Sequence, residues 1–325
     1  MKTITHFAVL VVTVHALRAV AALSDSSLMA RPTVLVTGST DGIGVTTAKN
    51  MAAKGYNVLI HGRSQQRLEA ASKTVRSFVQ QHSNDQDVGI FTLPPEDIST
   101  VSGCERLVKH VKSTCEEHDL KLSVLMNNAG VYMEDLIITE DGLEQTFAVN
   151  VLAPFVITSH LLPTLLQQKS RIVTASSLSQ CRSIRSWEDL QYSTRPYSAH
   201  GAYSESKLLD AMLTMEFASR LKEAGFGTDR ITCNCLDPGT VNTKMLLAGW
   251  GRIGIEVENA LDETWLCTDA EVESLTGQYF TWKSARRASA DAYDDTEHAK
   301  MWEVLSSLAP EAAAMWKFDF CERFS

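Results

Sequence analysis

Short apolar runs alternate along the chain with longer segments in which apolar residues recur at helical spacing. The apolar runs predict six buried strands, at residues 34–36, 57–60, 89–93, 122–126, 171–175 and 231–236. Helical spacing predicts helices at residues 45–53, 101–117, 142–166, 203–222 and 294–308. It also predicts one after Ser64, from the apolar and basic positions Arg67, Leu68, Ala71 and Val75, before a polar loop at residues 82–87. Strands that alternate with helices predict the α/β class, with a central parallel sheet flanked by helices.

The helix after the second strand has a polar start, and Ser64 is the side chain expected to cap it. No composition break or internal repeat interrupts the chain after Pro32. One doubly wound domain over residues 32–290 is therefore the simplest organisation. Residues 291–325 are expected to add a helical extension that packs on the domain and carries no evident chemistry.

The first 23 residues have the composition of a targeting segment. Lys2 precedes an apolar run from Phe7 to Leu17, and small residues follow Arg18. This pattern predicts a cleavable signal peptide and entry into the secretory pathway and endoplasmic reticulum. A membrane anchor is the less favoured alternative, because His15 and Arg18 interrupt the apolar stretch. The segment is also compatible with a two-part address to an organelle such as a plastid, so the final compartment stays open.

The net charge and the cysteine content argue against several classes of function. The net charge of −9 argues against a nucleic-acid partner, whose binding surface is usually basic. The cysteines are scattered and form no disulfide framework, and their expected role is that of small buried apolar residues. No second cysteine pair or histidine cluster is present, so no metal site is predicted. The seven positions are Cys104, Cys115, Cys181, Cys233, Cys235, Cys267 and Cys321.

A glycine-rich turn follows the first strand and carries Gly38, Gly42 and Gly44. A strand, a glycine turn and a helix in this order form the context of a dinucleotide-binding fingerprint. Glycines let the backbone approach a pyrophosphate, and the helix directs its N-terminus at it. The alternative is an ordinary tight turn. The later strands end in Asn, Ser or Pro-Gly, which a doubly wound (Rossmann) sheet would collect at one edge.

Tyr203 and Lys207 are four residues apart in a predicted helix and therefore share one of its faces. A free tyrosine has a pKa of about 10, and a neighbouring ammonium favours the phenolate and lowers this value. Such a tyrosine can act as a general acid or base for a carbonyl–alcohol pair, with Ser177 hydrogen-bonded to the carbonyl oxygen. The alternative for an isolated Tyr/Lys pair is an exposed helix face.

Taken together, these motifs resemble the short-chain dehydrogenase/reductase family, from Pro32 to about Gly277. The family's glycine turn, Asn-Asn-Ala-Gly motif, catalytic residues and Pro-Gly loop occur here in the same order. They stand at Thr37–Gly44, Asn127–Gly130, Asn150, Ser177, Tyr203, Lys207 and Pro238–Gly239. The segment before Tyr203 and the run Gly277–Phe280 are most similar to the retinol dehydrogenase and carbonyl reductase branch.

The resemblance implies a role for each catalytic residue. Tyr203 would transfer the proton, and Lys207 would bind the nicotinamide ribose and tune Tyr203. Ser177 would polarise the carbonyl, while Asn150 would hold a water that links Lys207 to solvent. The implied cofactor-binding residues are Gly38, Ser39, Thr40, Asp41, Gly42, Ile43, Gly44, Arg63, Asp97, Asn128, Ala129, Gly130, Tyr203, Lys207, Pro238 and Gly239.

The residues after the second strand favour NADP(H). An NAD enzyme usually has an acidic residue there for the ribose hydroxyl, whereas this chain has Arg63, which can pair with a 2′-phosphate. The alternative is that Arg63 is a solvated loop charge. The family resemblance implies that the segment after Pro238 forms an apolar lid over the substrate, and the alternative is that its apolar residues belong to the core. These residues are Val241, Met245, Leu246, Leu247 and Trp250.

The predicted function is NADP(H)-dependent interconversion of a small apolar alcohol with its aldehyde or ketone. The alternative is a catalytically silent NADP(H)-binding redox sensor. The family resemblance also implies a homodimer or tetramer formed through the helices around Asn150 and Tyr203.

Overall fold

The computed structural model describes residues 31–83, 87–249 and 251–318. Within these ranges the chain forms an eight-stranded sheet with the order β3-β2-β1-β4-β5-β6-β7-β8. Strands β1 to β7 are parallel, and β8 closes one edge as an antiparallel hairpin with β7. The strand bounds are Pro32–Val36 (β1), Asn57–Ile60 (β2), Ile90–Thr92 (β3), Lys121–Asn127 (β4), Ser170–Ala175 (β5), Ile231–Asp237 (β6), Gln278–Thr281 (β7) and Ser284–Arg286 (β8).

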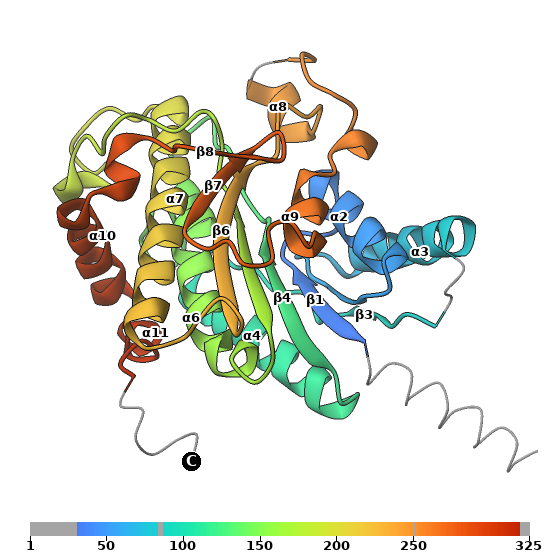
Figure 1. Ribbon diagram of the computed structural model, residues 1–325. Coiled ribbons are helices and arrows are strands. Elements are labelled where there is room, and N and C mark those ends of the chain that lie inside the picture. Colours follow the sequence, from blue (N-terminus) through green and yellow to red (C-terminus); the bar gives the residue numbers. More distant parts are fainter. Residues whose placement is uncertain (1–30, 84–86, 250, 319–325) are drawn as a thin grey trace, which may run out of the picture.

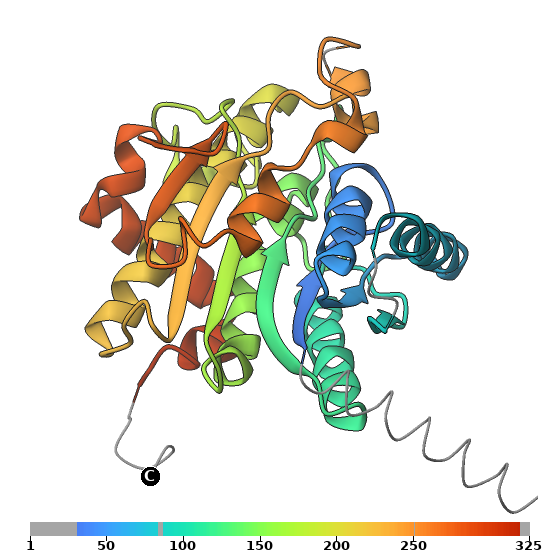
Figure 2. The same cartoon turned by 45° about the vertical axis from the view of Figure 1, so that its right-hand side comes forward.

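Helices cover both faces of the sheet, as the doubly wound prediction requires (Figure 1, Figure 2). One face carries α2 (Gly42–Ala53), α3 (Gln65–His82) and α9 (Asp262–Thr268). The other face carries α4 (Val101–Glu117), α6 (Ala153–Leu165) and α7 (Ala199–Glu223). The short helix α5 (Gln145–Phe147) leads into α6, and the short helix α8 (Lys244–Gly249) follows β6. The predicted signal segment, residues 1–23, lies outside the described residues.

The strands divide their side chains between two apolar cores. Val34 and Val36 of β1 belong to the core beneath α2 and α3, while Leu35 between them belongs to the core beneath α4, α6 and α7. All three side chains are fully buried. Side chains of a strand point alternately to its two faces, so a sheet covered on both sides needs continuous apolar runs. This explains why the strands were visible in the sequence as uninterrupted apolar segments.

The predicted start of one helix and the predicted cap of another are wrong, and the helices predicted from residues 45 and 203 begin earlier, at Gly42 and Ala199. The helix expected from Gly142 begins at Gln145, because Gly142 adopts a φ of 76° and Glu144 caps the helix. The Glu144 carboxylate accepts hydrogen bonds from the backbone N–H groups of Thr146 and Phe147 at 2.8 and 2.7 Å. Ser64 occupies the N-cap position of α3, but its side chain forms no capping hydrogen bond.

The two strands at the far edge were missing from the prediction. Strand β7 pairs with β6 in parallel, and β7 and β8 are joined by a tight turn at Trp282 and Lys283. Both turn residues have a positive φ, 52° and 56°, although such turns usually select glycine or asparagine. Because the strands are short and the turn lacks its usual residues, the sequence pattern gave no hairpin signal here.

The C-terminal extension packs against the outer faces of α6 and α7. It comprises α10 (Asp295–Leu308) and α11 (Pro310–Ala314), which lie beyond α7 and α6 on the side away from the sheet (Figure 1). The continuous helical stretch Gln145–Leu165 is long and apolar enough to cross a membrane, yet 83% of its most apolar 18-residue window is buried inside the protein. This stretch is therefore explained as a core helix. The domain boundary at residue 290 stays a prediction.

Candidate active site

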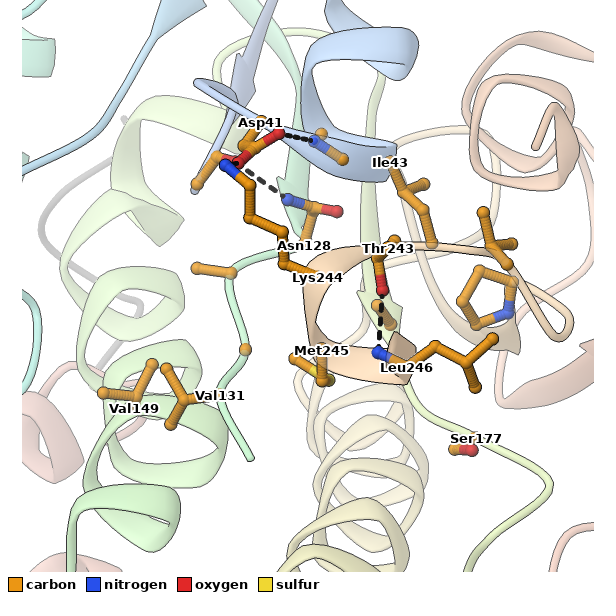
Figure 3. Close-up of a pocket in the computed structure, with 18 of the residues that line it drawn as sticks. Asp41, Ile43, Asn128, Val131, Val149, Ser177, Thr243, Lys244, Met245 and Leu246 are labelled. Carbon is orange, nitrogen blue, oxygen red and sulfur yellow. Dashed lines mark hydrogen bonds and ion pairs between the residues drawn. The ribbon is translucent and has the colours of Figure 1, made fainter. Parts of the chain in front are cut away.

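A cleft of about 450 Å³ lies at the carboxyl ends of the central strands. It begins at the glycine turn and extends to Ser177, Tyr203 and Lys207. Figure 3 shows Asp41 and Lys244 together at one end and Ser177 at the other. Most of the predicted cofactor-binding residues line it, namely Gly38, Thr40, Asp41, Gly42, Ile43, Gly44, Arg63, Asp97, Asn128, Ala129, Gly130, Pro238 and Gly239.

The glycine turn is shaped by two positions where a side chain would collide. Gly38 has a φ of 66°, and a Cβ there would lie 3.0 Å from the Cα of Ala129. A Cβ on Gly44 would lie 2.6 Å from the carbonyl oxygen of Gly38. These contacts let the turn fold tightly onto the start of α2. Gly42, Ile43 and Gly44 consequently line the cleft at the positive end of the helix.

His61 holds this turn from beneath, a role that the sequence analysis missed. The Gly38 N–H donates to His61 Nδ1 at 3.1 Å, and His61 Nε2 donates to the Glu96 carbonyl oxygen at 3.2 Å. Burial lowers the pKa of His61 to about 4, so the ring is neutral and can accept the Gly38 proton. Ser39 is buried and does not line the cleft; its hydroxyl oxygen accepts the backbone N–H of His61 at 3.0 Å. The structure therefore gives Ser39 a supporting position behind the turn.

The Asn-Asn-Ala-Gly motif ties the end of β4 to the same turn. The Thr37 hydroxyl oxygen accepts the backbone N–H groups of Asn128 and Ala129 at 3.1 and 3.0 Å. The Asn128 side-chain amide donates to the Thr37 carbonyl oxygen at 2.7 Å. These bonds fix two strand ends relative to each other, so Asn128, Ala129 and Gly130 form one wall of the cleft.

Basic side chains gather at the end of the cleft near the glycine turn. Arg63, Arg67 and Lys244 all line it, and Asp41 forms ion pairs with Arg67, at 2.9 Å, and with Lys244 (Figure 3). Partial burial acts to raise the pKa of Asp41, but Lys244, Gly42 and Arg67 hold it below its usual value. Asp97 lies 3.7 Å from Arg63 in an exposed pair. Lys244 escaped the sequence analysis because it lies 203 residues from Asp41.

Ser177, Tyr203 and Lys207 meet at the opposite end. Lys207 Nζ lies 5.7 Å from the centre of the Tyr203 ring, and Ser177 hydrogen-bonds to Tyr203. Burial raises the pKa of Tyr203, and Lys207 and Ser177 offset only part of this effect. The predicted lowering by Lys207 exists, but the net direction is upward. Tyr203 therefore holds its proton at neutral pH, which suits a general acid.

Asn150 stands behind the cleft wall. It lies in η1 (Ala148–Leu152), a π-helical segment between α5 and α6, and such segments often occur at functional sites. Its amide accepts from the Val131 N–H at 2.8 Å and donates to the Val131 carbonyl and to the Ser206 hydroxyl, both at 3.0 Å. Asn150 does not line the cleft itself. The water that the family resemblance assigns to it stays a prediction.

The expected lid is partly present. Val241, Met245 and Leu246 line the cleft from the β6–α8 segment, whereas Leu247 is 45% exposed and does not line it. Figure 3 shows Met245 and Leu246 between the basic end and Ser177. Ile253, which the sequence analysis did not select, also lines the cleft. Trp250 lies outside the described residues.

Comparisons with known proteins agree with this architecture. The family model for short chain dehydrogenases matches residues 32–249. Retinol dehydrogenase 14 from Homo sapiens is 31% identical over 86% of this chain and 87% of its own length. Polyprenol dehydrogenase from Homo sapiens is 30% identical, over 82% of each chain. A short chain dehydrogenase from Shigella flexneri, solved in complex with NADP, has a TM-score of 0.57 and 22% identity over 78% of this chain and 98% of its own.

The chain therefore belongs to the short-chain dehydrogenase family, and it is an oxidoreductase that acts on alcohols. Its curated relatives place it in the retinol dehydrogenase-like branch.

Proposed function

We propose that this protein is an NADP(H)-dependent oxidoreductase that interconverts an apolar alcohol with its aldehyde or ketone. The observation that carries the proposal is the meeting of Ser177, Tyr203 and Lys207 in the cleft that begins at the glycine turn. A protein that only bound a nucleotide would need the glycine turn but not this acid–base group. The same cleft therefore brings together a nucleotide-binding end and a proton-transfer end.

The residues present fit an anionic dinucleotide. The N-terminus of α2 faces the cleft and favours a pyrophosphate, with a backbone approach that a Cβ on Gly44 would block. Arg63, Arg67 and Lys244 supply the positive charge that a 2′-phosphate requires. When bound, NADPH would supply the hydride, which no amino-acid side chain can provide.

The acid–base group would act on the substrate oxygen. In reduction, Ser177 donates a hydrogen bond to the carbonyl oxygen, and Tyr203 delivers the proton to that oxygen. The raised pKa of Tyr203 keeps this proton available at neutral pH. The Lys207 ammonium stabilises the phenolate that remains after transfer. In oxidation of an alcohol, the same phenolate would accept the proton.

The substrate is proposed to be apolar because Val131, Val149, Met245 and Leu246 line the cleft. Of these, Met245 and Leu246 lie on the side toward Ser177 (Figure 3). Retinol and polyprenol, which appear in the names of two relatives, are apolar alcohols. A lid of this composition would exclude water from the reacting carbonyl and stabilise hydrocarbon next to it.

A panel assay tests the proposed function. The purified protein is mixed with NADPH or NADH and with medium-chain aldehydes, ketones or retinal, and nicotinamide absorbance is followed. We expect turnover with NADPH, and faster turnover with apolar carbonyls than with polar ones of similar size. Tight NADPH binding without turnover on any member of the panel would contradict the proposal and favour the redox-sensor alternative.

The Arg63→Ser variant tests the preference for NADP(H). Loss of an exposed charge-assisted bond to a phosphate is expected to weaken NADPH binding about tenfold, or about 1.4 kcal/mol. NADH lacks that phosphate, so its affinity should not change. Fluorescence titration with each nucleotide measures both constants. The control is Arg76→Ser, because Arg76 lies on α3, the helix that follows Arg63, and does not line the cleft. An equal loss of affinity for NADH would assign Arg63 a general structural role.

Cellular location and assembly are also part of the proposal. Residues 1–23 would direct the protein into the secretory pathway through the endoplasmic reticulum. A homodimer or tetramer formed through α6 and α7 would have to displace α10 and α11, which pack on those helices. Any such oligomer is therefore expected to use another surface of the domain.

A further inference from the structure

Asp210 forms a buried ion pair with Lys207. It lies on α7 one turn beyond Lys207, and the two charged groups are 2.8 Å apart, from Nζ to Oδ2. Only 6% of the Lys207 side chain and 1% of the Asp210 side chain are exposed. The family motifs used above assign no role to Asp210. Charged groups are rarely buried unless they are paired, because their removal from water is unfavourable. The role of this buried pair therefore requires an explanation.

Two oxygen acceptors hold the Lys207 ammonium in place. Lys207 Nζ donates to the Ala175 carbonyl oxygen at 2.8 Å as well as to Asp210. The second carboxylate oxygen of Asp210, Oδ1, is buried and has no hydrogen-bond partner among the described residues. The charge of Asp210 is therefore offset mainly by Lys207, and the two groups are tightly coupled in position and charge.

Other titratable groups surround this pair on the packed elements. Tyr203 lies on the same helix, Glu263 reaches the region from α9, and Asp237 and Cys235 belong to β6. The Glu263 carboxylate accepts a hydrogen bond from the Thr47 hydroxyl at 2.7 Å, and Asp237 accepts the Leu178 and Gly239 N–H groups. Burial raises the pKa of Cys235 to about 12, so it stays a neutral thiol. Of these groups, Asp210 is the carboxylate that the structure places in contact with the Lys207 ammonium.

We propose that Asp210 is a positioning residue that fixes Lys207 and balances its charge, and thereby sets the pH range in which Tyr203 can deliver its proton. The inference rests on the proposed roles of Tyr203 and Lys207. Without a counter-charge, a buried ammonium next to Tyr203 would favour the phenolate strongly. The negative charge of Asp210 cancels part of the electrostatic effect of the ammonium, so Tyr203 keeps its proton for reduction.

The sign of the effect follows from the order of ionisation. Burial raises the pKa of Asp210 to about 7, and Lys207 opposes this shift. Burial raises the pKa of Tyr203 above its usual value, so Asp210 is already an anion when Tyr203 loses its proton. Removing the anion should therefore lower the pKa of Tyr203, by about one unit at an effective dielectric constant near 20. Reduction, which needs the phenol, would then fail at a lower pH, while oxidation would begin at a lower pH.

The Asp210→Asn variant tests this directly. Asparagine keeps an oxygen that can accept from Lys207 but removes the negative charge. In the protein without nucleotide, ultraviolet absorbance follows phenolate formation, and subtracting the same titration of Asp210→Asn/Tyr203→Phe isolates Tyr203. We expect its titration to move down by about one pH unit, and the alkaline limb of carbonyl reduction to move with it. Affinity for NADPH, measured by fluorescence, should change much less than kcat at alkaline pH.

Two further variants make the result decisive. Asp210→Ser also removes the charge and leaves room for a water beside Lys207. It should give the same shift of the Tyr203 titration, and it replaces the asparagine variant if that variant does not fold. Glu263→Gln removes a buried carboxyl from the same region without touching Lys207, and a smaller shift is expected. Unchanged Tyr203 titration in both Asp210 variants, or an equal shift in Glu263→Gln, would overturn the inference. The absorbance titration does not depend on turnover. Failure of the proposed function would therefore be seen in a separate measurement, in which the Tyr203→Phe variant remains active.

Discussion

Replacing Tyr203 by phenylalanine is expected to lower kcat for carbonyl reduction by about 100- to 10,000-fold, the usual contribution of a positioned general acid. The change removes one oxygen and leaves the ring between Ser177 and Lys207. NADPH should bind nearly as before, because the glycine turn and the basic residues are untouched. Single-turnover absorbance measures the chemical step, and fluorescence titration measures binding.

The Tyr197→Phe variant is the matched control for this experiment. Its hydroxyl donates to the Met133 carbonyl oxygen at 2.9 Å, and Tyr197 does not line the cleft. We therefore expect its kcat to stay close to that of the unchanged protein. If Tyr203→Phe retained most of its activity, the proton would have to come from another group, and the proposed roles of Lys207 and Asp210 would fall with it.

Replacing Trp316 by alanine is expected to lower the free energy of unfolding by about 3–5 kcal/mol, as for other buried tryptophans. Trp316 is only 4% exposed and stacks on Phe217 of α7, with ring centres 4.4 Å apart. Its indole N–H donates to the Ser159 hydroxyl of α6 at 2.7 Å. The residue thus fastens the end of the C-terminal extension to two core helices, and denaturant unfolding measures the loss.

Two variants separate the causes of this effect. Trp316→Phe keeps most of the ring stacking and removes the hydrogen bond to Ser159, so a smaller loss is expected. Trp282→Ala changes a tryptophan that is 62% exposed, and its stability should stay within about 0.5 kcal/mol of the unchanged protein. An unaltered unfolding midpoint in Trp316→Ala would show that the extension contributes nothing to the stability of the domain.

Much of the fold could be predicted because it is encoded locally. The strand that ends at Val36 is a continuous apolar run, as a strand covered on both faces must be. The helix from Val101 to Glu117 was predicted with its observed bounds, since its apolar positions repeat at helical spacing and Thr100 caps it. The hairpin at Trp282 was missed because its strands are short and its turn lacks glycine.

The candidate site could likewise be predicted only in part from the sequence. Tyr203 and Lys207 could be paired from the sequence because four residues on a helix bring two side chains to one face. His61 could not be recognised as the support of the glycine turn, because its partner Gly38 lies on another strand end. Lys244 follows the sixth strand and lies 203 residues from Asp41, so no local pattern predicts their ion pair.

The sequence by itself determined the order of the first six strands and of the main helices between them, the glycine turn, and the spacing of Tyr203 and Lys207, because each depends on residues close together in the chain. Only the tertiary structure decided that burial outweighs Lys207 in raising the pKa of Tyr203, and that the C-terminal extension covers α6 and α7. It also decided that Asp210 is buried against the Lys207 ammonium. Burial and long-range contacts arise from the packing of whole elements, and the energy of a charge depends on that packing.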